Sequence, residues 1–126
     1  MRPVLVDTSV WVDHFRRHNP GLAELLAMDL ALCHPMVLGE IACGSPPSRT
    51  QTLADLAQLP SAQQASLQEV LAFLEREQLF GPGCGFVDIT LLASTLLTPG
   101  AELWTLDKRL AALAERAGLL HRPAVH

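Results

Sequence analysis

The segment Pro3-Val4-Leu5-Val6-Asp7-Thr8-Ser9-Val10-Trp11 decides how the rest of the chain is interpreted. It begins with a short, uninterrupted apolar run, which is typical of a strand buried on both faces of a parallel sheet. Asp7 ends this run, and Thr8 and Ser9 then lead into a helix. Because ligands of open α/β sheets bind beyond the carboxyl ends of the strands, Asp7 lies where a site is expected.

Strands and helices alternate through the remainder of the sequence. Two more strands are predicted, at Leu30 to Cys33 and at Glu102 to Thr105. Helices are predicted after Ser9, from Pro20 through Met28, from Pro35, from Thr50 to Leu59, from Ala62 to Gln78, from Phe86 to Leu97 and from Lys108 to Ala117. This order predicts an α/β fold in three layers, with a central, mainly parallel sheet flanked by helices.

Length and composition indicate one globular domain over residues 1–126, of which 49% are hydrophobic. The apolar stretches are much shorter than the roughly 20 residues of a membrane span. The amino-terminal apolar run is also too short for a signal peptide, so we expect a cytoplasmic protein without a membrane partner. Cys33, Cys43 and Cys84 have no paired spacing and are interpreted as small buried hydrophobic residues.

Four acids on four separate segments are the candidate functional residues: Asp7, Glu40, Asp88 and Asp107. The chain carries 13 acidic and nine basic residues, so its net charge of -4 equals the charge of this set. Hard cations such as Mg²⁺ and Mn²⁺ select carboxylate and water ligands. The set therefore points to metal-assisted phosphate chemistry, in which one or two ions could be held.

Each acid has a plain structural alternative. Asp7 could cap a helix, and Asp88 and Asp107 could interact favourably with the dipole at a helix amino-terminus. Glu40 could be an exposed surface residue. The functional interpretation gains from the position of Asp7 after a buried strand. It gains also from the apolar neighbours of Glu40 in Leu38-Gly39-Glu40-Ile41-Ala42, where a surface acid is less expected.

Four short motifs together resemble the PIN-domain ribonucleases, and more narrowly the VapC-type toxins of bacterial toxin-antitoxin pairs. They cover nearly the whole chain and occur in the family's order. The motifs are Val6-Asp7-Thr8-Ser9-Val10-Trp11, Leu38-Gly39-Glu40-Ile41-Ala42, Gly85-Phe86-Val87-Asp88, and Leu103-Trp104-Thr105-Leu106-Asp107 followed by Arg109-Leu110.

The resemblance implies that the four acids are catalytic and hold Mg²⁺ or Mn²⁺. It also implies that Thr8, Ser9 and Thr105 orient carboxylates or water, although helix capping is an equally good role for Thr8. A net acidic chain needs a local basic rim to bind a polynucleotide. Arg16 and Arg17 could supply one edge of that rim, and Lys108 and Arg109 another, with a solvated helix face as the alternative for each.

The function expected from this family is that of an endoribonuclease toxin, which hydrolyses RNA phosphodiesters with metal-activated water. A DNA nuclease of similar fold and a non-catalytic module with an acidic cleft are the alternatives. The family also implies a homodimer and a cognate antitoxin that binds across the acidic groove in a larger complex. The apolar segments Leu25 to Met28 and Leu53 to Leu59 are candidates for the dimer surface.

Overall fold

A three-stranded parallel sheet organises the fold. The computed structural model describes residues 1–81 and 83–123. In it β1 (Val4–Val6) lies between β2 (Ala31–Leu32) and β3 (Glu102–Trp104) and pairs in parallel with both. All three residues of β1 are completely buried, as the apolar run predicts for a central strand. The carboxyl ends of β1 and β3 consequently meet at one edge of the sheet.

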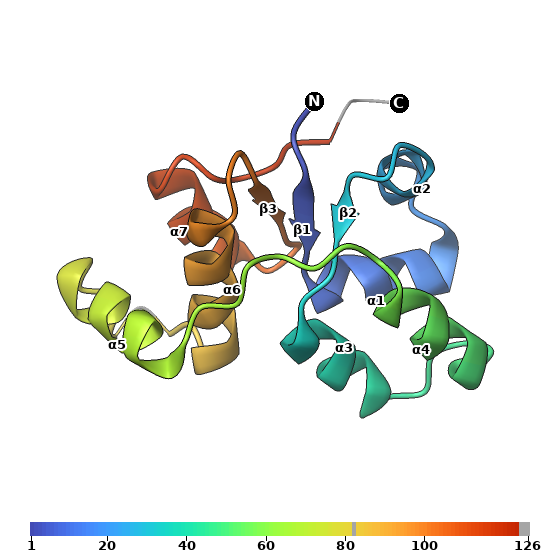
Figure 1. The fold of residues 1–126 in the computed structure, drawn as a ribbon, viewed down its shortest axis with the longest axis horizontal. Helices are drawn as coiled ribbons and strands as arrows, with labels where there is room; N and C mark the ends of the chain where they lie inside the picture. Colours follow the sequence, from blue (N-terminus) through green and yellow to red (C-terminus); the bar gives the residue numbers. More distant parts are fainter. Residues whose placement is uncertain (82, 124–126) are drawn as a thin grey trace.

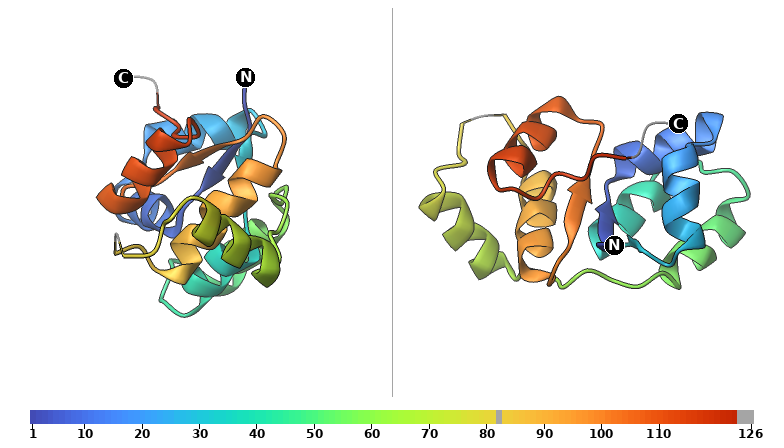
Figure 2. Two further views of the ribbon diagram at one scale, coloured as in Figure 1. Left: turned by 90° about the vertical axis from the view of Figure 1, so that its left-hand side faces the viewer. Right: turned by 90° about the horizontal axis from the view of Figure 1, so that it is seen from above.

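Helices flank the sheet, so the predicted α/β architecture is confirmed (Figures 1 and 2). Figure 1 shows α5, α6 and α7 beside β3, and α1 to α4 on the side of β2. The helices of the described chain are α1 (Thr8–Arg17), α2 (Pro20–Ala27), α3 (Pro35–Ala42), α4 (Arg49–Ala57), α5 (Leu67–Arg76), α6 (Phe86–Leu97) and α7 (Lys108–Arg116). None of these helices is long and apolar enough to span a membrane.

The predicted helix from Ala62 to Gln78 begins too early. In the structure α5 starts at Leu67, because Ser66 and Glu69 form a capping box in which each side chain accepts a hydrogen bond from the other's backbone N–H. The preceding residues instead extend the edge of the sheet. The backbone N–H of Ala62 donates to the carbonyl of Cys33 over 3.0 Å. The helical spacing of the apolar residues further along does not predict this contact.

A second feature beyond the sequence prediction is the carboxyl-terminal segment beside β3. The N–H of Leu103 donates to the carbonyl of Leu119 (2.7 Å), and the N–H of His121 donates to the carbonyl of Leu103 (2.8 Å). This pairing covers the free edge of β3. It leaves the strand order unchanged, since only an isolated parallel bridge between Leu103 and Leu120 forms.

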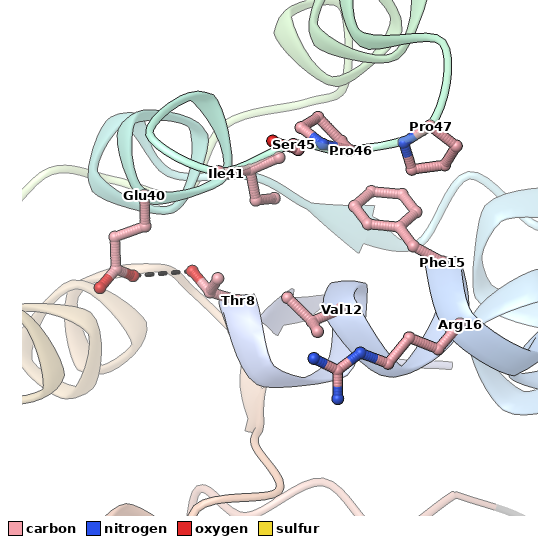
Figure 3. Close-up of a pocket in the computed structure, with 10 residues that line it drawn as sticks. Thr8, Val12, Phe15, Arg16, Glu40, Ile41, Ser45, Pro46 and Pro47 are labelled. Carbon is pink, nitrogen blue, oxygen red and sulfur yellow. Dashed lines mark hydrogen bonds between the residues drawn. The ribbon is translucent and has the colours of Figure 1, made fainter.

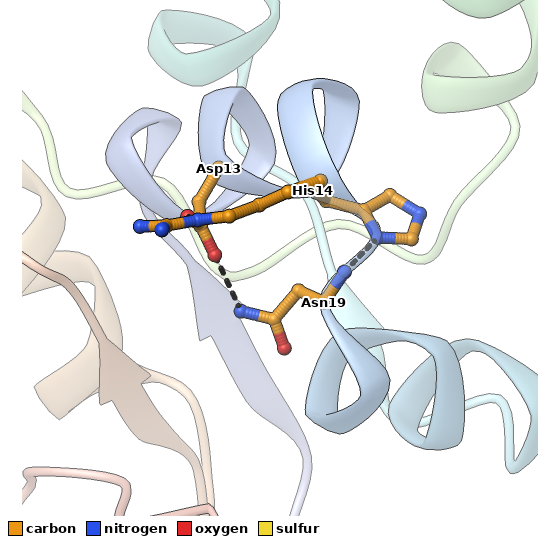
Figure 4. A network of polar contacts seen from close by, with 4 residues as sticks. Asp13, His14 and Asn19 are labelled. Carbon is orange, nitrogen blue, oxygen red and sulfur yellow. Dashed lines mark hydrogen bonds and ion pairs between the residues drawn. The ribbon is translucent and has the colours of Figure 1, made fainter.

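The corner between α1 and α2 is fixed by a small polar network (Figure 4). Asp13 accepts hydrogen bonds from Arg17 Nε (2.6 Å) and Asn19 Nδ2 (3.1 Å). The backbone N–H of Asn19 donates to His14 Nδ1, and the Asn19 side chain caps α2 by accepting from Leu22 N–H. Asp13 is thus a structural residue of this corner, and it holds Arg17.

The start of α3 depends on a buried histidine. His34 is 3% exposed, and its Nδ1 accepts a hydrogen bond from the backbone N–H of Met36. The ring proton of neutral His34 must then be on Nε2, which lies 3.1 Å from Ser94 Oγ and donates to it. Protonation of the ring would remove the cap acceptor and place a charge in the core.

The stability of the protein should therefore fall in acid through His34. Burial lowers the pKa of His34 below 6.5, so the native state binds fewer protons than the unfolded chain. This contribution is fully present above pH 6.5 and is lost as pH falls through the folded pKa. We expect the free energy of urea unfolding to decrease more steeply below that pH in wild type than in His34→Asn, which keeps a cap acceptor but does not titrate. Equal slopes for the two proteins would contradict this role.

Candidate active site

The carboxylate of Asp7 joins the ends of β1 and β3. Asp7 is 6% exposed, and its Oδ2 accepts hydrogen bonds from Ser9 Oγ (2.7 Å), Thr105 Oγ1 (2.8 Å) and the Ser9 backbone N–H (3.4 Å). Ser9 Oγ in turn accepts from the backbone N–H of Leu106. Asp7 caps α1, which is the structural role expected for it from the sequence. It also lies at the sheet edge where a site was predicted.

Glu40 reaches the same edge from α3. Its Oε1 accepts a hydrogen bond of 2.7 Å from Thr8 Oγ1, at the first residue of α1. The Glu40 side chain is exposed, but it is tied to the residue that follows Asp7. Thr8 therefore positions a second acid beside the first.

Asp107 and Asp88 complete the set from the opposite side. The Asp107 side chain caps α7 by accepting from the backbone N–H of Leu110 (2.9 Å), and its own N–H donates to Thr105 Oγ1 (3.0 Å). Asp88 lies in the first turn of α6. Thr105 thus contacts both Asp7 and Asp107 and fixes the positions of these two residues relative to each other.

Asp88 lies within electrostatic range of the other three acids. Burial is the largest cause that raises the pKa of Asp88, and the negative charges of Asp7, Asp107 and Glu40 raise it further in that order. A hydrogen bond from the Gly85 backbone acts in the opposite direction. Acids that are widely spaced in sequence therefore contribute to one region of negative charge around Asp88.

Helix amino-termini offset part of this repulsion. Asp7 and Asp107 are the N-cap residues of α1 and α7, and Asp88 lies in the first turn of α6. The positive end of each helix dipole stabilises a nearby carboxylate, by about 0.3 to 1 kcal/mol at an exposed position. The capping and functional roles are therefore compatible in this protein.

The donor set suits a hard divalent cation. Within the described chain, the side-chain hydrogen bonds to Asp7, Glu40 and Asp107 go to one oxygen of each carboxylate, Oδ2, Oε1 and Oδ1 respectively. The second oxygen of each is left for a ligand. As the side chains lie, no three His, Cys, Asp or Glu groups of the described residues already form a metal cage. Mg²⁺ commonly keeps several waters and takes only one or two carboxylates, so a closed cage is not required.

The four predicted basic residues differ in their surroundings. Arg17 is paired with Asp13, and Arg109 Nη1 donates to the Gly83 carbonyl over 3.3 Å. Arg16 lines a cavity together with Thr8 and Glu40. Lys108 is exposed in the first turn of α7, directly after Asp107. Of the four, Arg16 shares a cavity with Glu40.

Two features near the acids were not identified from sequence. The cavity beside Glu40 is formed by residues from α1, α3 and the connector after α3, so no single motif reveals it. Cys84 is the other feature. Burial raises the pKa of its thiol, and the charges of Asp88 and Asp107 raise it further. The interpretation of the cysteines as buried is correct for Cys33 but wrong for Cys43, which is exposed, and for Cys84, which is half-buried.

Comparison with known proteins identifies the family. Ribonuclease VapC32 from two strains of Mycobacterium tuberculosis, CDC 1551 / Oshkosh and ATCC 25618 / H37Rv, is 46% identical over 116 residues, which is 92% of this chain and 94% of the relative. The chain belongs to the VapC family. No family model matches the sequence. The VapC relationship confirms the resemblance found in the four motifs and agrees with the PIN-like α/β fold.

In this VapC chain, removal of the Asp88 charge should stabilise the metal-free protein. A raised folded pKa means that the native state binds more protons than the unfolded chain, so the contribution of Asp88 is lost as pH rises through that pKa. Asp88→Asn should therefore melt at a higher temperature than wild type at neutral pH in EDTA. The control is Asp29→Asn, which removes one charge from an exposed position whose φ of 55° asparagine also adopts. A lower melting temperature for Asp88→Asn would mean that its hydrogen bond to Gly85 outweighs the repulsion.

Proposed function

We propose that the protein is a metal-dependent endoribonuclease and the toxin of a toxin-antitoxin pair. The observation that carries the proposal is that Asp88 lies within electrostatic range of Asp7, Glu40 and Asp107, in a chain of the VapC family. The relatives are named ribonucleases, which favours RNA as the substrate. The balanced charge of the remaining residues agrees with a protein whose excess negative charge serves one site.

The four acids would hold Mg²⁺ or Mn²⁺ through the carboxylate oxygens that the protein does not use. When bound, such an ion supplies positive charge that offsets the phosphate and lowers the pKa of a water molecule. Ser9 and Thr105 fix the Asp7 carboxylate, and Thr8 fixes that of Glu40. These hydroxyls orient the ligands before substrate arrives, which reduces the reorganisation that the site must undergo.

The reaction proposed is hydrolysis with water as the nucleophile. The water oxygen forms a bond to phosphorus while the bond to the 3′ oxygen breaks, which gives a 5′-phosphate and a 3′-hydroxyl. The 2′-hydroxyl of the substrate does not take part. Discrimination against DNA must therefore come from binding contacts outside the reacting atoms.

The carboxylates should be essential for cleavage but not for folding. We expect Asp7→Asn and Asp88→Asn to keep the wild-type circular dichroism spectrum and to lose cleavage of structured RNA and inhibition of growth. Mn²⁺ at about a hundred times its dissociation constant should stabilise wild type by roughly 2.7 kcal/mol, since it binds only the folded site. Asp88→Asn should lose most of that gain. Asp29→Asn, whose side chain is exposed, is the charge-matched control for both measurements.

The same assay separates the two alternative functions. Cleavage of DNA of matched sequence under the conditions that cleave RNA would indicate a nuclease that does not discriminate by sugar. A non-catalytic module would bind Mn²⁺ and gain stability without cleaving either polymer. Cleavage that persists in excess EDTA would contradict the metal dependence altogether.

We assign the proposed homodimer to a surface other than the two segments named from the sequence. Leu25 and Leu56 are buried in the core, whereas Met28 is 43% exposed and Leu26, Leu53 and Leu59 are partly buried, so these two segments offer less free apolar surface than their sequence indicates. More of the large exposed apolar side chains lie on α5 and at the end of α6. They are Leu67, Leu71, Leu96 and Leu97. Leu96 and Leu97 also line a groove of about 190 Å³ between the two helices.

We expect Leu97→Glu to convert a dimer of the protein to a monomer, because it places a charge in the proposed α5–α6 interface. Met28→Glu is the matched control, since Met28 and Leu97 are both 43% exposed. Light scattering of both variants at micromolar concentration measures the effect. A wild-type monomer, or a dimer that only Met28→Glu disrupts, would refute this interface.

The proposed antitoxin would cover the acidic site. A segment with a basic side chain complements the four carboxylates and would compete with both cation and RNA. Co-expression with the product of the neighbouring gene, followed by purification of the complex, identifies such a partner.

A further inference from the structure

A cavity of about 370 Å³ opens beside the acidic site (Figure 3). Its apolar walls are Val12 and Phe15 from α1, Ile41 from α3, and Pro46 and Pro47 from the connector that follows. Figure 3 shows the ring of Phe15 directed toward the two prolines, across the open space. The cavity therefore has an aromatic side and a rigid, flat opposite side.

One end of this cavity belongs to the acidic site. Thr8 and Glu40 both line it, and they are joined there by the hydrogen bond between Thr8 Oγ1 and Glu40 Oε1. Glu40 also acts on the pKa of Asp88. A molecule that fills the cavity would therefore lie beside Glu40, the one acid of the site that lines it.

The cavity also has a positive charge at its edge. Arg16 lines it and extends beside Val12 along α1. No ion pair or hydrogen bond of the described residues engages the Arg16 side chain, whereas the adjacent Arg17 is held by Asp13 at 2.6 Å. Of these two neighbouring arginines, Arg17 is thus paired within the protein, and Arg16 is available to bind an anion.

We propose that this cavity binds one unpaired base of the RNA substrate next to the scissile phosphate, and that Arg16 binds the phosphate beside that base. The proposal rests on the proposed ribonuclease function and adds a specificity-determining subsite to it. The base would stack on Phe15 and contact the prolines, as bases of single-stranded RNA stack on aromatic side chains.

An RNA base fits these observations better than an apolar peptide side chain does. An apolar peptide explains the walls, but it leaves the unpaired Arg16 without a role. A nucleotide explains both the aromatic wall and the cation, because it joins a flat base to a phosphate. Stacking alone tolerates any base, so the subsite selects an unpaired nucleotide over a paired one.

The test measures RNA binding separately from cleavage. Wild type in EDTA is titrated by fluorescence anisotropy into labelled single-stranded RNA of mixed sequence, and into the same RNA with one base at a time removed. Phe15→Leu keeps an apolar side chain but removes the ring. Arg16→Gln and Arg17→Gln form a matched pair of charge removals on the same helix. Melting temperatures confirm that each variant is folded.

We expect wild type to lose about tenfold in affinity when one particular base is missing, the order of effect seen for one stacked base. Phe15→Leu should bind the intact and the abasic RNA equally. Arg16→Gln should lower the dependence of log affinity on log salt by about 0.7, which corresponds to one phosphate contact on a single strand. Arg17→Gln should change this slope less.

Base dependence that is unchanged in Phe15→Leu would overturn the subsite, even if the protein cleaves RNA. If both Phe15→Leu and Arg16→Gln bind RNA normally but no longer co-purify with the neighbouring gene's product, the cavity is a protein-docking surface and the proposal is wrong. Absence of cleavage by wild type with Mn²⁺ would refute the ribonuclease function, and the binding titrations would still decide whether the cavity holds a base.

Discussion

The buried carboxylate of Asp7 is the contact on which the arrangement of the site depends. One oxygen of this group accepts from Ser9 on α1 and from Thr105 at the end of β3, so it links the central strand, the helix that follows it and the neighbouring strand. Burial of a charged group is costly unless it is paired or hydrogen-bonded. The three hydrogen bonds to Oδ2 satisfy one oxygen and leave the other available.

Satisfaction of the carboxylates by neutral hydroxyls and backbone N–H groups has an electrostatic consequence. Arg or Lys partners would neutralise the acids and compete with a cation for their oxygens. Thr8, Ser9 and Thr105 hold them in place and leave their charge intact. The helix amino-termini at Asp7 and Asp107 supply only partial positive charge, so a net attraction for cations survives. The network around Asp13 contrasts with this, because Arg17 pairs with that acid directly.

Local sequence was enough to place the strand-end acids but not the features formed between distant segments. The apolar run before Asp7 indicates a buried strand, and parallel pairing then brings Asp7 and Asp107 to one edge. Glu40 was identified from its apolar neighbours and the family motif, while its anchor on Thr8 depends on how α3 approaches α1. The start of α5 was mispredicted because Ser66 caps the helix, and the helical spacing of apolar residues does not locate a cap. The cavity beside Phe15 was not predicted, because its walls come from α1, α3 and the connector after α3, which are separate in the sequence.

The double use of Asp7 and Asp107 as helix caps also limits how this protein can diverge. Most replacements at either position would remove a cap as well as a charge, and would cost stability together with any cation affinity. Asn, Ser and Thr are exceptions, because they cap helices without carrying a charge. A related protein could therefore lose the acidic site and keep the fold if Asn, Ser or Thr replaced Asp7 and Asp107. Asn, Ser or Thr at both positions would indicate a relative that has kept the fold without the acidic site.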